Sequence, residues 1–393
     1  MREPECPAVC FLIRNLTGGG AEKQVGLLAA GLAEAGVRTS VFWLEDRPQH
    51  PRMRALIDAE RRAGVRFFPP RAGSRFDIGQ VPRLARMLFS APHGVLWTWG
   101  HRADGVALAL SVIVPGVRII GSLRSANAKR IAKNAWLWRL LARRFDGFVS
   151  NSHANMELVA RVAPQVRRKG VVVNNIVEDS FLGGVRTPRP LRDPLRVAML
   201  GNQSVHTKGY DIAIEVARDL KRCGDRIRIC IGGAPSDAAQ LRAAIAAYGV
   251  EQQIEVCGTI ADPRAFFSDS DVFLMLSRFE GTSNALLEAM ASGLPCVCTR
   301  VGDVGRFARH RQHLLVVDTN AAAACAALRE LNANREAAQA MGARAARLVR
   351  ENFGREQAIK SALGFVLGCA GAGYAANDGM PGDKSLYGSQ LAG

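Results

Sequence analysis

The sequence has no closely spaced cysteine pairs, few acidic side chains and no long apolar run. The nine cysteines are scattered without a C-x2-C spacing. This pattern argues against a zinc site or a disulfide framework and predicts reduced thiols in a cytoplasmic protein. The longest apolar run, Val106 to Val114, is too short to cross a bilayer. The first residues lack a basic, apolar leader, so we expect no signal peptide.

The shortage of acidic residues leaves the chain strongly basic. It has 393 residues with 52 Lys+Arg against 35 Asp+Glu, a formal net charge of +17. The imbalance is largest in residues 1–180, which hold 27 basic and 14 acidic side chains. We expect this half to face nucleic acid, an acidic membrane or an anionic substrate. Nucleic acid is the least favoured of the three, because no binding module is recognisable and the aromatic residues do not interleave with a basic groove.

Short apolar segments alternate with helical patterns along the chain. Strands are predicted at residues 8–13, 37–44, 93–98, 117–121, 147–150 and 170–173 of the first half. In the second half they are predicted at 195–201, 226–232, 253–258, 272–276 and 295–300. This alternation predicts an α/β protein with two Rossmann-like, doubly wound domains facing a cleft.

Glycines and prolines between residues 183 and 194 interrupt this alternation. The predicted organisation is a domain over 1–182, a linker over 183–194 and a second domain over 195–350. Helices are expected over 321–342 and 344–352, and a C-terminal helix over 351–368 that crosses back to the first domain. The Gly-rich tail, 369–393, is predicted to be disordered.

Residues 277–295, SRFEGTSNALLEAMASGLP, are the most informative stretch. Glu280 and Glu288 are separated by a polar turn and the start of an apolar helix. Ser283 or Asn284 would cap that helix, and its free N–H groups would point at whatever lies beside Glu280. Such a site suits an anionic or polyhydroxyl ligand, whose hydroxyls would satisfy both acids. The plain alternative is an exposed Glu280 and a Glu288 paired with a core arginine.

This stretch resembles the signature of retaining glycosyltransferases of family 4, in which the two acids of an E-x7-E motif hold a nucleotide sugar. The resemblance covers about residues 10–365 and implies the GT-B fold, with an acceptor domain followed by a nucleotide-sugar domain. It implies that Glu280 contacts sugar hydroxyls near the reacting carbon and that Glu288 binds the ribose diol. It also implies that four backbone N–H groups face the sugar and phosphate, those of Gly281, Thr282, Ser283 and Asn284.

Two loops, each following the first strand of one half, extend the resemblance. One contains three consecutive glycines and resembles the Gly-Gly-Ala-Glu turn of family 4, which implies that Gly19 and Gly20 lie against the donor. The other ends in Lys208 and a glycine, as the phosphate-binding loop of the family does. Asn202 stands where the family more often has an arginine, so one expected phosphate contact is missing. The alternative for Lys208 is a solvated loop lysine.

Two further basic residues follow strand ends in the first half, where the crevice of such a sheet lies. A histidine near the position of His101 often touches the sugar 6-hydroxyl in the family. The alternative is a surface histidine that caps the following helix. Arg124 could meet an acceptor or a phosphate, or serve as a structural ion-pair partner.

The Asp269-Ser270-Asp271 triplet matches the metal-binding motif of the other large glycosyltransferase fold. Here it precedes an apolar strand and is expected to cap a turn. Family 4 enzymes mostly work without a metal, so the resemblance implies neither a metal nor another cofactor.

Residues 127–145 are predicted to form one helix with two contrasting faces. A core stripe contains Ile131, Ala135, Trp138, Ala142 and Phe145. The opposite face mixes cations with two apolar side chains: Lys129, Lys133, Trp136, Leu140, Arg143 and Arg144. Such a face suits an anionic lipid surface. The alternative is that another segment covers Trp136.

Together these features predict a cytoplasmic enzyme, peripheral on the inner face of the membrane. It would move a sugar from a nucleotide, expected to be UDP, to a hydroxyl of a lipid-linked or polysaccharide acceptor, with retention at the anomeric carbon. The alternatives are a nucleotide-sugar epimerase of the same fold, a nucleic-acid-binding protein and a carbohydrate-binding relative without catalysis.

Overall fold

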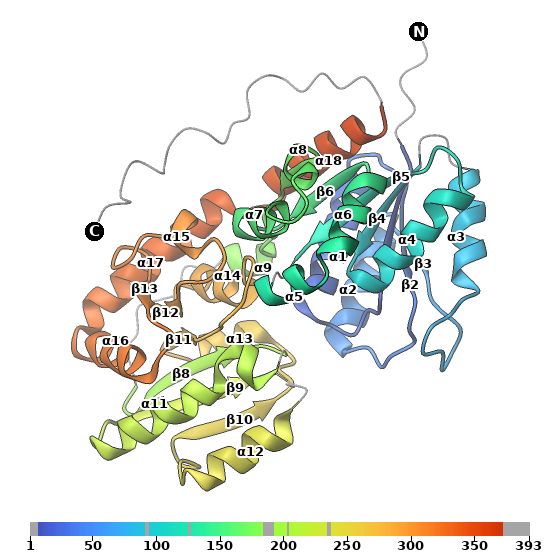
Figure 1. Cartoon of the computed structure of the whole chain (residues 1–393). Coiled ribbons are helices and arrows are strands. Elements are labelled where there is room, and N and C mark those ends of the chain that lie inside the picture. Colours follow the sequence, from blue (N-terminus) through green and yellow to red (C-terminus); the bar gives the residue numbers. More distant parts are fainter. Residues whose placement is uncertain are drawn as a thin grey trace.

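Two parallel β-sheets with helices on both faces form the two halves of the molecule (Figure 1). The computed structural model describes residues 7–90, 94–124, 127–183, 192–202, 204–233 and 237–371. In spatial order the N-terminal sheet contains β3 (Arg66–Phe68), β2 (Thr39–Trp43), β1 (Val9–Ile13), β4 (Val95–Trp99), β5 (Arg118–Leu123), β6 (Gly147–Ser150) and β7 (Gly170–Val172). The C-terminal sheet contains β10 (Ile254–Gly258), β9 (Ile227–Gly232), β8 (Leu195–Leu200), β11 (Val272–Met275), β12 (Cys296–Thr299) and β13 (Leu315–Val317).

The helices alternate with these strands. The N-terminal domain contains α1 (Gly20–Glu34), α2 (Pro51–Arg62), α3 (Gln80–Phe89), α4 (His101–Ile113), α5 (Ala128–Lys133), α6 (Ala135–Arg144), α7 (His153–Ala160) and α8 (Gln165–Arg168). Next come α9 (Asp179–Leu182), α10 (Val205–Lys208), α11 (Tyr210–Arg222), α12 (Ala238–Ala247), α13 (Pro263–Ser268), α14 (Asn284–Ala291), α15 (Val304–Phe307), α16 (Ala321–Ala333), α17 (Arg335–Asn352) and α18 (Arg355–Cys369). The predicted α/β class with two doubly wound domains is confirmed.

The central strands are apolar along their whole length because both of their faces are covered. Every residue of β1, β2 and β4 is buried, and separate apolar clusters fill the two sides of each sheet. Continuous apolar runs are the sequence mark of such parallel strands. Strands β3 and β13, each of three residues, were not predicted, although the equally short β7 was.

The winding of each sheet reverses next to its first strand, between β1 and β4 and between β8 and β11. Ligands of doubly wound sheets bind outside the carboxyl ends of the strands at such reversals. The loops that follow these four strands begin at residues 14, 100, 201 and 276. They carry most of the candidate residues, so the fold gathers these residues at one cleft.

Two predicted helices are divided differently in the structure. The prediction of one continuous helix over 127–145 is wrong, because Asn134 separates α5 from α6. The break predicted near residue 343 lies at Asn334, between α16 and α17. In both cases the asparagine side chain donates to the carbonyl four residues earlier, of Arg130 at 2.8 Å and of Glu330 at 3.3 Å. Such a bond competes with the backbone hydrogen bonds that would continue the helix.

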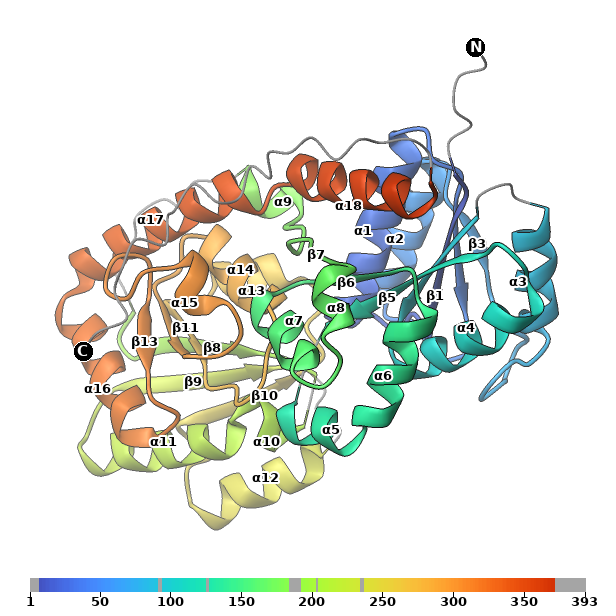
Figure 2. The same cartoon turned by 45° about the horizontal axis from the view of Figure 1, so that its top comes forward.

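The last described helix returns to the N-terminal domain. Figure 2 shows α18 lying beside α1, beyond the end of α17. Arg355 pairs with Glu34 at 2.8 Å, and Ile359 lies over Gly31. Most of the predicted linker (184–191) and of the tail (372–393) lies outside the described residues. No helix of the described part is long and apolar enough to span a membrane.

Candidate active site

The first acid of the motif, Glu280, forms an ion pair with Lys208. Lys208 Nζ lies 2.5 Å from Glu280 Oε1, and Ser277 Oγ donates to the same oxygen at 3.0 Å. Only 12% of the Lys208 side chain and 9% of the Glu280 side chain are exposed. The loop after β8 therefore meets the loop after β11, and Lys208 is not a solvated loop lysine.

Gly209 lets these two loops approach. Its φ is +69°, and a Cβ at this position would lie 2.1 Å from the carbonyl oxygen of Leu276. Any larger residue would be strained and would push Lys208 away from the end of β11. The Lys-Gly pair seen in the sequence is thus a geometric requirement of this contact.

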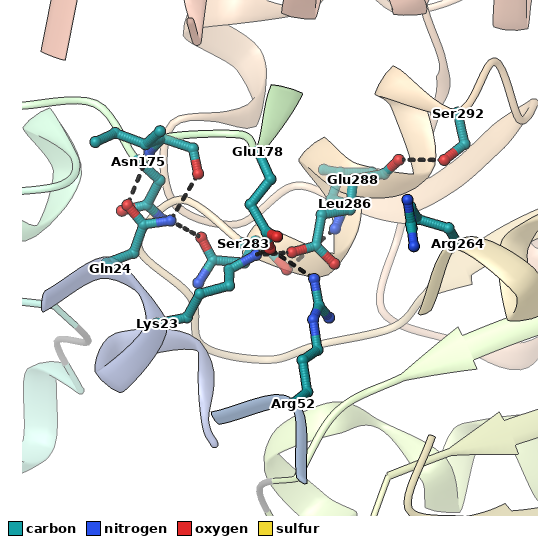
Figure 3. A network of polar contacts seen from close by, with 12 residues as sticks. Lys23, Gln24, Arg52, Asn175, Glu178, Arg264, Ser283, Leu286, Glu288 and Ser292 are labelled. Atoms are coloured by element: carbon teal, nitrogen blue, oxygen red, sulfur yellow. Dashed lines mark hydrogen bonds and ion pairs between the residues drawn. The ribbon is translucent and has the colours of Figure 1, made fainter. Parts of the chain in front are cut away.

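The second acid, Glu288, is buried and meets a lysine of the other domain. It lies on α14, whose N-cap Ser283 accepts a hydrogen bond from Leu286 N at 3.5 Å. Lys23 Nζ donates to Glu288 Oε1 and also lies 3.3 Å from Glu178. Figure 3 shows Lys23 reaching toward Glu288 and Glu178 from the N-terminal domain. The alternative of a core arginine partner is wrong, because the partner is a lysine across the cleft.

Arg52 completes this network at the edge of the cleft. Its Nη2 lies 2.5 Å from Glu178 Oε1 (Figure 3). Two basic side chains therefore meet two acidic ones where α1, the start of α2 and α14 converge. The burial of Lys23 and Glu288, with side chains 10% and 7% exposed, makes their pairing necessary in the ligand-free protein.

The glycine loop before α1 lies directly against the other domain. A Cβ on Gly20 would lie 2.5 Å from Asn284 Nδ2, and Gln24 Nε2 donates to Asn284 Oδ1 at 3.1 Å. The N–H groups of Gly18 and Gly19 both donate to the Glu22 carboxylate, the former at 2.7 Å. Gly20 thus lies opposite Asn284 at the start of α14, whereas Gly19 contacts Glu22 in the first turn of α1.

Gly281 and Thr282 contact a row of asparagines in the N-terminal domain. Thr282 Oγ1 donates to Asn151 O at 2.6 Å, and Asn175 Nδ2 donates to Thr282 O at 2.8 Å. A Cβ on Gly281 would lie 2.5 Å from both Asn151 Oδ1 and Asn155 Nδ2. Gly281 is therefore needed for the two domains to approach this closely.

The guanidinium of Arg124 is buried close to this contact, and no carboxylate of the described residues pairs with it. Its guanidinium lies 3.7 Å from the ring centre of Trp99, and Nη1 donates to Asn175 Oδ1 at 3.0 Å. Its Nε and Nη2 have no hydrogen-bond partner within the part of the chain that the structure describes. Burial lowers the pKa of Arg124 to about 9. The alternative of a structural ion pair finds no support among the described residues, and the two unpartnered donors leave Arg124 able to bind an anion.

His101 is the first residue of α4 rather than its cap, which is Gly100. Its ring meets Trp138 edge-on at 5.7 Å, and Nδ1 lies 3.8 Å from Asp104 Oδ2. Burial, and then the charge of Arg130, lower the pKa of the histidine. Its described contacts are with these residues and not with the Lys208–Glu280 pair.

The remaining predicted positions are Asn202 and the two acids of the Asp-Ser-Asp triplet. Asn202 is exposed on the loop after β8, close to Gly233. Asp269 pairs with Arg192 at 2.6 Å, and the buried Asp271 accepts from Arg196 N at 2.9 Å. The two acids of the triplet thus hold the start of β8 beside β11.

The face predicted for a membrane is divided between α5 and α6. Trp136 is 65% exposed, so the alternative that another segment covers it is wrong. Leu140 is half-buried, and the four cations are exposed: Lys129, Lys133, Arg143 and Arg144. On the opposite side Ile131, Trp138, Ala142 and Phe145 are buried, whereas Ala135 is half-buried.

Several residues of the site were not found in the sequence. Lys23, Glu178 and the asparagines at 151 and 175 lie far from the motif along the chain, so only the fold reveals them. The position of Lys23, directly after the acid of the glycine loop, was the one available signal.

A second group of residues, outside this site, was also not predicted from the sequence. The possible ligand atoms of Cys230, Glu255 and Cys257 lie within 4.8 Å of one another on β9 and β10.

Sequence comparisons match both halves of the chain. The description "Glycosyltransferase Family 4" applies to residues 18–181 and "Glycosyl transferases group 1" to residues 190–348. WcaL of Salmonella typhimurium, named for colanic acid biosynthesis, is 31% identical over 212 residues, covering 51% of this chain and 50% of WcaL. AmsK of Erwinia amylovora, an amylovoran biosynthesis glycosyltransferase, is 31% identical over 128 residues, covering 30% and 31%. The matches span half or less of these curated relatives.

Solved structures match almost the whole chain. Anabaena HepE in complex with UDP and glucose superposes with a TM-score of 0.74 at 15% identity, covering 90% of this chain and 97% of HepE. TarM superposes with a TM-score of 0.76 at 12% identity, covering 93% and 99%. At such identities the likeness concerns the fold, and it confirms the GT-B architecture implied by the sequence.

Proposed function

The chain belongs to the glycosyltransferases of the GT-B fold, with a family 4 domain followed by a group 1 domain, and we propose that it moves a sugar from a nucleotide donor to an acceptor hydroxyl. One observation carries this proposal: Glu280 and Glu288 flank the contact that Thr282 and Asn284 make with the N-terminal domain, and each acid pairs with a lysine. A sugar with its hydroxyls and a ribose with its diol can replace these lysines as hydrogen-bond partners. The two lysines would then be free for the negative charge of a diphosphate.

The donor is proposed to be a UDP-sugar. HepE was solved with UDP-glucose, and this chain shares its fold. Lys208 lies where the loop after β8 approaches Glu280, so a small movement would carry its ammonium from that acid to a phosphate oxygen. Preorganised cations of this kind stabilise the charge that develops on a leaving diphosphate. Helix α14 begins four residues after Glu280, at Asn284, and the N–H groups of its first turn would add to this positive charge.

We propose retention at the anomeric carbon, with attack on the face from which the diphosphate leaves. The bond between the anomeric carbon and the phosphate oxygen breaks first and gives a short-lived, oxocarbenium-like ion pair. The acceptor oxygen then bonds to the anomeric carbon, and its proton passes to the leaving phosphate oxygen. Glu280 and His101 would orient the sugar. Neither a side-chain base nor a metal is needed for this sequence.

The acceptor is proposed to be lipid-linked or a polysaccharide, handled at the inner face of a membrane. Support comes from the N-terminal domain, where exposed Trp136 lies among exposed cations. Such a face suits the headgroup region of an anionic leaflet. Arg124, with two donors unoccupied, would hold an anionic group of the acceptor or donor near the Gly281–Thr282 contact.

A donor screen tests this proposal and separates it from its rival, an epimerase of the same fold. Purified protein is incubated with UDP-, GDP- and ADP-sugars, and nucleotide release and sugar products are measured with and without an acceptor. Slow release without acceptor, accelerated by acceptor, supports transfer. An isomerised sugar formed without any acceptor would show an epimerase instead, and no release from any donor would contradict both.

A further inference from the structure

Three arginines converge on one buried carboxylate at the carboxyl edge of the N-terminal sheet. Arg14 follows β1, Glu45 lies two residues beyond β2, and Arg102 is the second residue of α4. Arg14 Nε donates to Glu45 Oε1 at 2.8 Å and Arg47 Nε to Oε2 at 3.3 Å, while Arg102 Nη1 also donates to Oε1. None of these residues was predicted from the sequence.

This cluster has an excess of positive charge. Among the described residues, Glu45 is the one carboxylate within ion-pair distance of the three guanidinium groups. Its side chain is fully buried, whereas those of Arg14, Arg47 and Arg102 are 46%, 51% and 51% exposed. The neighbouring Asp46 accepts instead from Gly73 N, at 2.7 Å. Glu45 thus holds the three guanidinium groups from their buried side. The cluster keeps a net charge of about +2, and most of its N–H donors remain available to a ligand from the solvent side.

Rigid guanidinium groups of this kind match the oxygens of phosphate esters. The buried carboxylate reduces the cost of ordering the arginines when a ligand binds, because they are already held in place. The cluster lies beside His101, which belongs to the same helix turn as Arg102. A phosphate bound here would therefore lie at the acceptor side of the cleft.

An apolar groove begins at the same arginine. It has a volume of about 560 Å³ and is lined by Phe76, Val81, Val106 and Ala109, with His101 and Arg102 at the start of α4. Phe76 is 41% exposed and the nearby Ile78 is 74% exposed. The volume is within the range of small-molecule sites, roughly 300–1,000 Å³. A phosphate at the cluster and a hydrocarbon chain in the groove could belong to one molecule.

The composition of the segment that forms the groove favours a lipid as that molecule. Residues 71–144 contain 13 Lys+Arg and two Asp, and both acids, Asp77 and Asp104, are buried. Phe76, Ile78, Phe89, Val112, Ile113 and Trp136 are exposed on the same segment. Exposed apolar side chains that lie among cations, without exposed acids, complement an anionic amphiphile better than they complement a free anion.

We propose that the acceptor is a phosphate-bearing lipid, with its phosphate on Arg14, Arg47 and Arg102 and its chain along the groove between α3 and α4. This deepens the proposed function and rests on it for the identity of the acceptor. The acceptor hydroxyl would then approach the anomeric carbon from the side of His101.

Binding of a soluble prenyl diphosphate to the full-length protein tests the site without any sugar donor. Calorimetry compares farnesyl diphosphate, inorganic diphosphate and farnesol. We expect farnesyl diphosphate to bind at least about tenfold more tightly than either part alone. Arg102→Gln should weaken farnesyl diphosphate and inorganic diphosphate by about tenfold or more, the value of one charge-assisted hydrogen bond. Ala109→Trp, which fills the exposed groove, should weaken only farnesyl diphosphate.

Arg118→Gln is the matched control. Arg118 is 49% exposed and pairs with Asp146 at 2.9 Å, but it lies at the opposite end of the sheet, at the start of β5. Its removal should leave all three affinities unchanged. Equal affinity for farnesyl diphosphate and inorganic diphosphate, or no loss in Arg102→Gln, would overturn the proposal. If only Lys208→Gln lowered the affinity for the diphosphates, the anion would bind at the donor site, and the proposal would be overturned as well. A chain that binds the probe as expected but transfers no sugar would contradict the proposed function alone.

Discussion

Buried glutamates have opposite surroundings in two regions of the molecule, the cleft and the contact between α1 and α2. In the cleft, Glu280 and Glu288 each have a lysine partner. Between the helices, Glu60 is 2% exposed and neither of its carboxylate oxygens has a hydrogen-bond partner in the described chain. Burial raises the pKa of Glu60 to about 8, with small opposing effects of Arg355 and Glu178. The core acid without partners is thus held neutral near pH 7, whereas each cleft acid pairs with a lysine that a ligand can replace.

The largest expected effect comes from breaking the pair between the domains. Lys23→Met should lower the free energy of unfolding by about 3–5 kcal/mol, because it leaves Glu288 buried and less compensated. Lys23→Met with Glu288→Met should recover most of that loss, since no charge is then left alone. Chemical denaturation of both variants checks this. Equal losses in the single and the double variant would mean that the pair does not act as a unit.

Replacing the core acid should instead stabilise the protein at high pH. The folded-state pKa of Glu60 lies above its unfolded value, so the folded protein holds the proton longer. The stability of the wild type should therefore fall as pH rises from about 4.5 to about 8, by at most about 1.4 kcal/mol per pH unit. Glu60→Gln should flatten this slope. A pH series of thermal unfolding, with Glu215→Gln on α11 as an exposed control, tests the contrast.

Removing the interfacial aromatic should have a moderate effect on binding alone. Trp136→Ala should weaken co-sedimentation with acidic vesicles at low salt, and turnover on a soluble acceptor analogue should stay unchanged. Each cation near the surface contributes about 1 kcal/mol, which added salt should screen. No binding of the wild type to acidic vesicles, or equal binding of the variant, would contradict a membrane-binding role for this face.

The smallest effect is expected for metal removal. Asp269 and Asp271 already bind Arg192 and the backbone of Arg196, so EDTA should leave turnover unchanged. Asp269→Asn with Asp271→Asn should change thermal stability but not the rate measured below the melting temperature. Loss of turnover in EDTA, restored by a divalent ion, would give these acids the catalytic role that we deny them.

Local signals predicted much of this molecule. Ser283 caps α14 as expected, because a helix start depends on neighbouring residues. The breaks at Asn134 and Asn334 were missed although they are also local, since a side chain bonding its own backbone leaves no mark in apolar periodicity. The partners of the acids were not predictable: Lys23 and Glu288 are 265 residues apart. The Arg14–Glu45–Arg102 cluster likewise exists only because three strands end at one edge.

The central claim is that the two cleft acids hold different parts of one nucleotide sugar, and the two variants Glu280→Gln and Glu288→Ala test it most directly. Nucleotide affinity and single-turnover sugar transfer are measured for each. Glu280→Gln should keep the nucleotide affinity and lose at least about tenfold in transfer rate, since a charged hydrogen bond contributes about 1.5–3 kcal/mol. Glu288→Ala should mainly weaken nucleotide binding. Near-wild-type transfer by Glu280→Gln would contradict the account.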